Sequence, residues 1–165
     1  MIPVAGRMAI AGGVLTLALG LLTACGPSPA GSGGLVGHVS GTSDVAGQPG
    51  APAASGGGLA ILPIAVMDGP FWELTGVEPL ADPQEWAELV VPLSKSDVSE
   101  LGGTVTPIDE DGDFRVTVQP GEYAVCYWPG EIGRRVNGCA DLEVPREGEL
   151  AALWGEGGFD IAVKE

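Results

Sequence analysis

Hydrophobic and polar residues alternate most clearly in the last third of the chain. Residues 114–118 place one Phe and two Val at every second position, which is typical of a strand with one buried face. Pro120-Gly121 predicts a tight turn, and apolar alternation resumes at Tyr123. Further short strands, bounded by turn residues, are expected at 103–108, 138–144, 150–154 and 159–163.

The first half of the chain contains two apolar runs separated by a segment without large side chains. Residues 35–39 and 59–67 each predict a strand. Pro63 interrupts the second run, so we expect a sheet edge or a bulge at that point. Residues 41–58 are rich in Gly, Ala, Pro and Ser. This composition is too poor in large apolar groups to pack, and it predicts a long loop or part of a tether.

The middle of the chain carries helix signals instead. Asp82 and Pro83 form a good N-cap and first-turn pair, and a short helix is expected to follow and to end at Pro92. Ser96 is expected to cap another turn that runs through Leu101. The whole pattern therefore predicts an all-β fold, an antiparallel Ig-like sandwich of about seven or eight strands with a short helical insertion.

Strand alternation favours a disulfide between Cys126 and Cys139. Each cysteine lies on the face of its strand opposite the expected core residues, so the two thiols leave the core face together, as a cross-strand bridge requires. A loop of this length would stabilise the fold by about 3 kcal/mol. A two-cysteine metal site is the alternative, but His38 is the sole histidine and lies far away in the sequence.

The N-terminal segment has the three parts of a secretory signal. Residues 1–8 carry one positive charge, at Arg7. Residues 9–22 are almost wholly apolar, and small residues follow them. The apolar run is shorter than the roughly 20 residues that a membrane-spanning helix needs. Leu22-Thr23-Ala24-Cys25 resembles a lipobox, at which a bacterial envelope enzyme attaches diacylglycerol to the cysteine thiol. An ordinary signal peptide with an incidental cysteine is the alternative.

The lipobox resemblance implies a division of the chain into three parts. Residues 1–24 would be the signal peptide, 25–34 a lipidated flexible tether, and 35–165 the sandwich domain. Cys25 would carry diacylglycerol and an N-acyl chain, and two or more acyl chains anchor a protein durably. The mature protein is therefore expected outside the cytoplasm, lipid-anchored at the surface of the cell membrane.

The charge balance bears on possible partners. The chain has a net charge of −15, and removal of residues 1–24 would take away Arg7 and no acidic residue. Such a chain repels the phosphates of nucleic acids, so no nucleic-acid partner is expected. An acidic surface most often only keeps a protein soluble.

A family resemblance is carried by residues 109–125, which read DEDGDFRVTVQPGEYAV. This segment resembles the carboxypeptidase regulatory-like, transthyretin-like β-sandwich family. The shared pattern is an acidic-Gly turn, a strand that begins with an aromatic residue, a Pro-Gly turn and then Tyr-x-Val. Residues 37–39 and 47–51 resemble the opening of that family more loosely. Members are mostly non-enzymatic modules for structure, ligand binding or partner binding. Urate-pathway hydrolases of the same fold need histidines and a Ser-Arg-Gly-Ser-type tail, whereas this sequence has the single histidine His38 and ends in Ala-Val-Lys-Glu165, so that activity is not expected.

Asp109, Asp111 and Asp113 are the candidate metal ligands. Their alternate spacing resembles the first three ligands of an EF-hand calcium loop. The sixth position is Phe114 instead of Gly, and the twelfth is Pro instead of Glu. Gly112 is better explained as the positive-φ residue of a hairpin turn. No other cofactor is expected.

Trp128, Arg134 and Arg135 are the candidate partner-binding residues. Trp128 shares a strand face with Cys126, away from the expected core, so it is the best candidate for an exposed tryptophan among the four in the chain. It could equally cover the disulfide. The two arginines lie in an otherwise acidic chain and could bind an anionic group on a partner or envelope polymer, although charged loops are usually just solvated.

Motifs for catalysis are missing from the sequence. No Gly-x-Ser-x-Gly motif and no phosphate-binding loop occur, and His38 has no triad context. We therefore expect a non-catalytic interaction module that contacts an envelope protein or polymer. The alternative is a sandwich that binds a small ligand or calcium.

Overall fold

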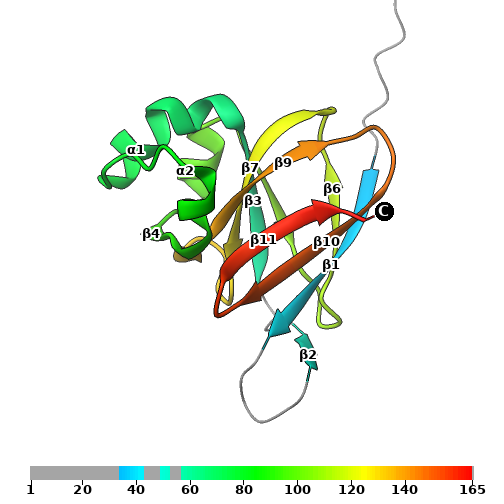
Figure 1. The fold of residues 1–165 in the computed structure, drawn as a ribbon. Coiled ribbons are helices and arrows are strands. Elements are labelled where there is room, and N and C mark those ends of the chain that lie inside the picture. The colour runs from blue at the N-terminus through cyan, green and yellow to red at the C-terminus, as the bar shows by residue number, and fades with distance from the viewer. Residues whose placement is uncertain (1–33, 43–48, 53–56, 165) are drawn as a thin grey trace, which may run out of the picture.

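Two β-sheets pack face to face, and short helices cover the outer face of one of them (Figure 1). The computed structural model describes residues 34–42, 49–52 and 57–164. The expected signal peptide, Cys25 and the expected tether lie outside these residues, except for Gly34. Within them the fold is all-β with a few short helices, as the sequence predicts.

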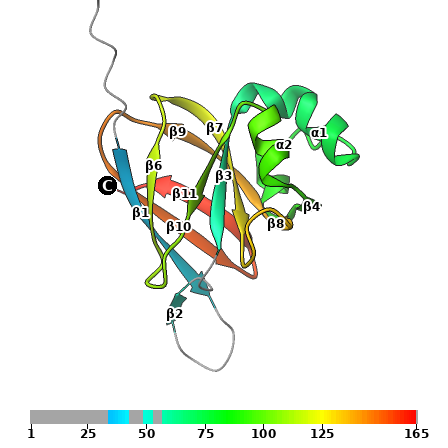
Figure 2. The same cartoon turned by 180° about the vertical axis from the view of Figure 1, so that it is seen from behind.

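The first sheet, sheet A, is built around β1. Its strand order is β11-β10-β1-β2, and β6 pairs with β1 on the same edge as β2 (Figure 2). β1 and β10 run parallel, and every other pair is antiparallel, so the expectation of a purely antiparallel sandwich is wrong at this pair. The strands are β1 (Gly34–Thr42), β2 (Pro49–Pro52), β6 (Asp113–Thr117), β10 (Glu149–Gly155) and β11 (Gly158–Val163).

The second sheet, sheet B, has the order β5-β3-β7-β9 and is antiparallel throughout. The Pro120-Gly121 turn does not close a hairpin, because β6 pairs in sheet A and β7 pairs in sheet B. The strands are β3 (Gly58–Pro63), β5 (Thr104–Pro107), β7 (Gly121–Trp128) and β9 (Cys139–Val144). A separate two-stranded sheet joins β4 (Val90–Pro92) to β8 (Arg135–Asn137).

The main core lies between sheets A and B. Alternate residues of each strand point into it, as the period of two requires. The buried members include Leu35, Val39, Phe114, Leu150 and Phe159 from sheet A, and Leu59, Ile61, Val125, Tyr127 and Leu142 from sheet B.

A second core lies between the outer face of sheet B and the helices. The helical layer comprises η1 (Ile64–Asp68), α1 (Pro70–Thr75), η2 (Pro83–Glu88) and α2 (Lys95–Glu100). Sheet B is therefore buried on both faces, and the run Leu-Ala-Ile-Leu in β3 reflects this because it is apolar at every position. The buried side chains of this core include Phe71, Trp72, Trp86, Leu93, Ala124, Cys126 and Trp128.

Several expected boundaries shift. Pro63 is the last residue of β3 and pairs with Tyr123 of β7, whereas the pairing of β3 with β5 ends at Ile61, so the proline lies where one side of the strand is locally an edge and no bulge is needed. α2 is capped by Ser94 instead of Ser96, and the Ser94 hydroxyl accepts a hydrogen bond from the Asp97 amide at 3.1 Å. The Asp82 cap is confirmed, because its carboxylate accepts from the Gln84 amide at 3.0 Å. The expected loop at 41–58 contains β2.

Tyr127 is completely buried in the main core, with its ring stacked on Phe159 at a centroid distance of 5.4 Å. Within the described part of the chain, its hydroxyl has no hydrogen-bond partner. Burial disfavours the charged phenolate and raises the pKa of Tyr127 to about 12 from the usual value of 10.0. The folded state therefore holds this proton more tightly than the unfolded state does.

We expect Tyr127→Phe to be more stable than the wild type at pH 8 by about 1 kcal/mol, because it removes a buried hydroxyl that lacks a partner. In the wild type, the stabilising contribution of the protonated tyrosine is complete below its unfolded pKa. As the pH rises from 10 toward 12, the free energy of unfolding of the wild type should fall by up to about 1.4 kcal/mol per pH unit. The free energy of unfolding of Tyr127→Phe should not show this fall. Urea unfolding at several pH values measures both effects.

Tyr123→Phe is the matched control for this prediction. The Tyr123 hydroxyl donates a hydrogen bond to the Gln119 carbonyl at 2.9 Å, so its removal should destabilise the fold by about 1 kcal/mol. A Tyr127→Phe variant that loses as much stability as Tyr123→Phe would show that the Tyr127 hydroxyl has a partner.

Candidate functional site

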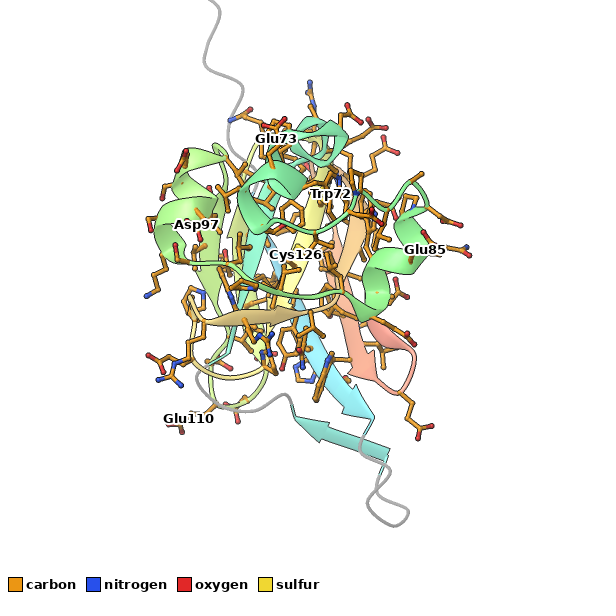
Figure 3. All side chains as sticks on the ribbon, turned by 90° about the vertical axis from the view of Figure 1, so that its left-hand side faces the viewer. Trp72, Glu73, Glu85, Asp97, Glu110 and Cys126 are labelled. Atoms are coloured by element: carbon orange, nitrogen blue, oxygen red, sulfur yellow. A yellow bond between two sulfur atoms is a disulfide. The ribbon has the colours of Figure 1, made fainter. Side chains whose placement is uncertain are left out.

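The Cys126–Cys139 disulfide is present in the structure and joins directly paired positions of β7 and β9. Both cysteines point away from the main core, as the alternation predicts. They point into the second core, however, and both are completely buried. The bridge therefore lies beneath the helical layer, as the position of Cys126 in Figure 3 illustrates.

The expectation that Trp128 is exposed is wrong. Its side chain is fully buried, and the indole Nε1 donates to the Leu93 carbonyl at 3.2 Å. The physical reason is the helical insertion, which covers the face of β7 that would otherwise meet solvent. Trp72 and Trp86 are buried in the same core, and Trp154 is half-buried against Tyr127. The tryptophans thus serve packing and offer no exposed platform.

Arg134 and Arg135 are exposed, as expected. Arg134 pairs with Glu131 through Nε and Oε2 at 2.7 Å, and its carbonyl accepts from the Leu93 amide at 3.2 Å. This connection holds the arginine loop near the start of α2, where Lys95 lies close to Gly133. We call Lys95, Arg134 and Arg135 the basic edge.

Asp109, Asp111 and Asp113 form a backbone-capped turn. The Asp109 carboxylate accepts from the Asp111 amide at 3.0 Å and from the Asp113 amide at 2.9 Å. Gly112 has φ 88°, so it is a positive-φ turn residue as expected, but the turn connects β5 of sheet B to β6 of sheet A, which meet in the bridge Ile108–Phe114. The described residues include no group of three or more His, Cys, Asp or Glu side chains placed to hold a metal ion. Calcium therefore gains no support from this turn.

A hollow of about 640 Å³ lies beside this turn, between β1, β5 and β6. It contains His38, whose Nδ1 lies 2.8 Å from Oδ1 of Asp113. The one hydroxyl-bearing residue of its lining, Thr106, is buried and donates to the Arg115 carbonyl at 3.3 Å. The hollow thus holds a solvent-exposed His-Asp pair beside a threonine whose hydroxyl is bonded to the backbone.

A second hollow, of about 620 Å³, opens between the helical layer and the outer face of sheet B. We call it the acidic groove. Its apolar floor consists of Ile64, Met67, Leu80 and Trp86; Tyr123 and Leu142 also border it, although their side chains pack in the main core. Its acidic rim consists of Asp68, Glu122, Asp141 and Glu143, which come from η1, β7 and β9. All four rim carboxylates are exposed.

Two indole hydrogen bonds fix the helical wall of the groove. Trp72 Nε1 donates to the Met67 carbonyl, which ties η1 to α1. Trp86 Nε1 donates to the Leu80 carbonyl at 2.9 Å, which holds the 76–82 connection against η2. Because both rings are buried in the second core, the wall is an extension of the packed domain. The groove is therefore preformed.

The groove carries a concentrated negative charge. Residues 39–94 contain no Lys, Arg or His, and neither β7 nor β9 contains one. In the described chain, the side-chain ion pairs are His38–Asp113, Arg134–Glu131 and Lys164–Glu149, and none involves a rim carboxylate. Figure 3 shows further acidic side chains, including Glu73 and Glu85, projecting from the helical layer. The rim charges are thus not balanced within the described domain.

Known proteins offer no match. Comparison of the chain with protein-family models, curated proteins and solved structures finds nothing similar to it. In the described ranges, no helix is long and apolar enough to cross a membrane.

The sequence did not reveal the groove, because its residues are spread over four segments. Two signals were present: the stretch free of basic residues from 39 to 94, and apolar residues next to acids in η1 and β9. Neither signal shows that these segments meet.

Proposed function

We propose that this protein is an extracytoplasmic lipoprotein, held at the membrane through acyl chains on Cys25, and that its β-sandwich is a non-catalytic interaction module. The acidic groove carries the second half of the proposal. It is a preformed hollow of about 620 Å³ with an apolar floor, and its rim carboxylates have no ion-pair partner among the described residues, as suits an interaction site. The sequence Leu22-Thr23-Ala24-Cys25 supports the anchor.

The arrangement of the domain suits an anchored module. The chain enters the domain through β1 in sheet A, whereas the groove opens on the outer face of sheet B, beside the helical layer. A tether attached at β1 would therefore leave the groove accessible. The buried disulfide is also consistent with an oxidising compartment.

The proposed relationship to transthyretin-like modules rests on the segment 109–125 and on the two packed sheets. The Tyr123 hydroxyl hydrogen-bonds back to the Gln119 carbonyl at the start of β7, similar to the tyrosine corner of Ig-like sandwiches. The parallel β1–β10 pair and the helical layer are additions to such a module.

The anchor predicts a clear effect of Cys25→Ala. Wild-type protein should incorporate an alkyne-labelled fatty acid and sediment with membranes, because two or more acyl chains hold a protein durably. The Cys25→Ala variant should take up no label and move to the soluble extracytoplasmic fraction. Both forms should melt at the same temperature, since the anchor lies outside the domain. An unlabelled wild type that fractionates like the variant would refute the anchor.

A further inference from the structure

We infer that the acidic groove binds a basic peptide segment of a partner protein, with an apolar side chain of that segment seated on the groove floor. The inference rests on the proposed interaction function and specifies the chemistry of the partner. Two features of the groove carry it: the apolar floor and the charge of its rim.

The floor sets the need for an apolar group. Met67 and Trp86 are buried at its base, and Ile64 and Leu80 are half-buried beside them. A volume of about 620 Å³ has room for a few side chains of a peptide. Methionine adapts its shape to different apolar partners, which suits a floor that receives a side chain.

The rim sets the sign of the charge. Asp68 borders the groove on the helical side, while Glu122, Asp141 and Glu143 border it on sheet B. An anionic or uncharged occupant would partly desolvate these carboxylates without a counter-charge, which is unfavourable. Lysine and arginine fit both requirements, because their aliphatic stems cover apolar surface while the charged ends reach the rim.

Two other occupants fit less well. Residues 25–58 of the chain itself contain no Lys or Arg, so this segment cannot neutralise the rim. A second copy could present its basic edge, but a copy also brings a net charge of −15. The long-range repulsion between two such chains opposes this association.

The test uses the purified full chain in detergent and a defined probe, the capped hexapeptide Lys-Leu-Lys-Lys-Phe-Lys. Two control peptides replace either the apolar residues with Ser or the Lys residues with Glu. The groove variant combines Asp68→Asn, Glu122→Gln, Asp141→Asn and Glu143→Gln. The matched control variant removes the same charge from exposed positions elsewhere: Glu100→Gln, Glu110→Gln, Asp111→Asn and Glu147→Gln. Thermal melting verifies that each variant is folded.

We expect the wild type to bind the hexapeptide Lys-Leu-Lys-Lys-Phe-Lys, and the groove variant to bind it at least about tenfold more weakly. The control variant should change the affinity by less than about threefold, because its charges lie away from the groove. The Ser-substituted peptide should bind more weakly than the probe, and the Glu peptide should not bind. Added salt should weaken the binding.

Several results would overturn the inference. Equal losses in the two variants would show a general effect of net charge, and equal binding of the Ser-substituted peptide would remove the role of the floor. Sedimentation could show that the wild type self-associates and that the double variant Arg134→Ala, Arg135→Ala does not. The occupant of the groove would then be a second copy of the chain. If the probe fails to bind but cross-linking in cells still captures a partner, only the partner chemistry is wrong. If both fail, the proposed interaction function is wrong as well.

Discussion

Trp128→Ala is expected to destabilise the protein by about 3–5 kcal/mol, which is the usual range for loss of a buried tryptophan. The side chain is completely buried in the second core, and its indole donates to the Leu93 carbonyl at 3.2 Å. Truncation would leave a large cavity and an unpaired carbonyl beneath the helical layer. Urea unfolding followed by circular dichroism measures the change, provided that the variant remains folded in buffer.

Trp128→Phe and Arg134→Ala provide the comparison for this prediction. Phe fills part of the space and should lose less stability than Ala, whereas Arg134 has an exposed side chain and should change stability by less than about 0.5 kcal/mol. A Trp128→Ala variant with wild-type stability and impaired partner binding would instead mean that Trp128 is an exposed contact residue.

Removal of the disulfide is expected to have the second-largest effect. Cys126 and Cys139 are separated by 13 residues, and cross-linking a loop of this size stabilises a protein by about 3 kcal/mol. The Cys126→Ala and Cys139→Ala double variant should therefore unfold at a clearly lower urea concentration. Since both cysteines are completely buried, alanine should be tolerated better than serine, which would bury hydroxyls.

A reductant separates the effect of the bridge from that of the lost sulfur atoms. Dithiothreitol should lower the melting temperature of the wild type and leave that of the double variant unchanged. Reduction of the folded wild type should be slow, because access to the sulfurs requires opening of the helical layer. A wild type that melts at the same temperature with and without reductant would show that the bridge adds no stability.

The sequence predicted the strands well where alternation and turn residues act together. Segments 138–144, 150–154 and 159–163 correspond to β9, β10 and β11, and the cap at Asp82 forms as expected. These features depend on local chemistry, namely the period of two in a strand and the hydrogen bonds of a helix end. The cysteine pairing also followed from alternation, because the two residues face the same side of sheet B.

The second core could not be predicted in the same way. Alternation alone predicts that one face of β7 meets solvent, yet Ala124, Cys126 and Trp128 on that face carry no charge. Such a continuous apolar run is typical of a strand buried on both faces. The cover over that face depends on long-range packing of residues 64–101, which no local pattern specifies.

The groove was unpredictable for the same reason. Met67, Trp86 and Asp141 are distant in the sequence, and they line one groove only because the helical layer packs across the outer face of sheet B. The parallel pairing of β1 with β10 is equally non-local, since the two strands lie at opposite ends of the described chain.

Photo-cross-linking in cells that make the protein tests the central claim most directly, namely that a membrane-anchored domain contacts a partner through the acidic groove. A benzoylphenylalanine replaces Ala81, an exposed residue of the groove lining, or Ala151, an exposed residue of β10 in sheet A. We predict an adduct from the Ala81 position in the membrane fraction, joined to a Lys- or Arg-rich peptide of one partner protein, and none from the Ala151 position. An adduct from Ala151 alone, or the same adducts from both positions, would contradict the account.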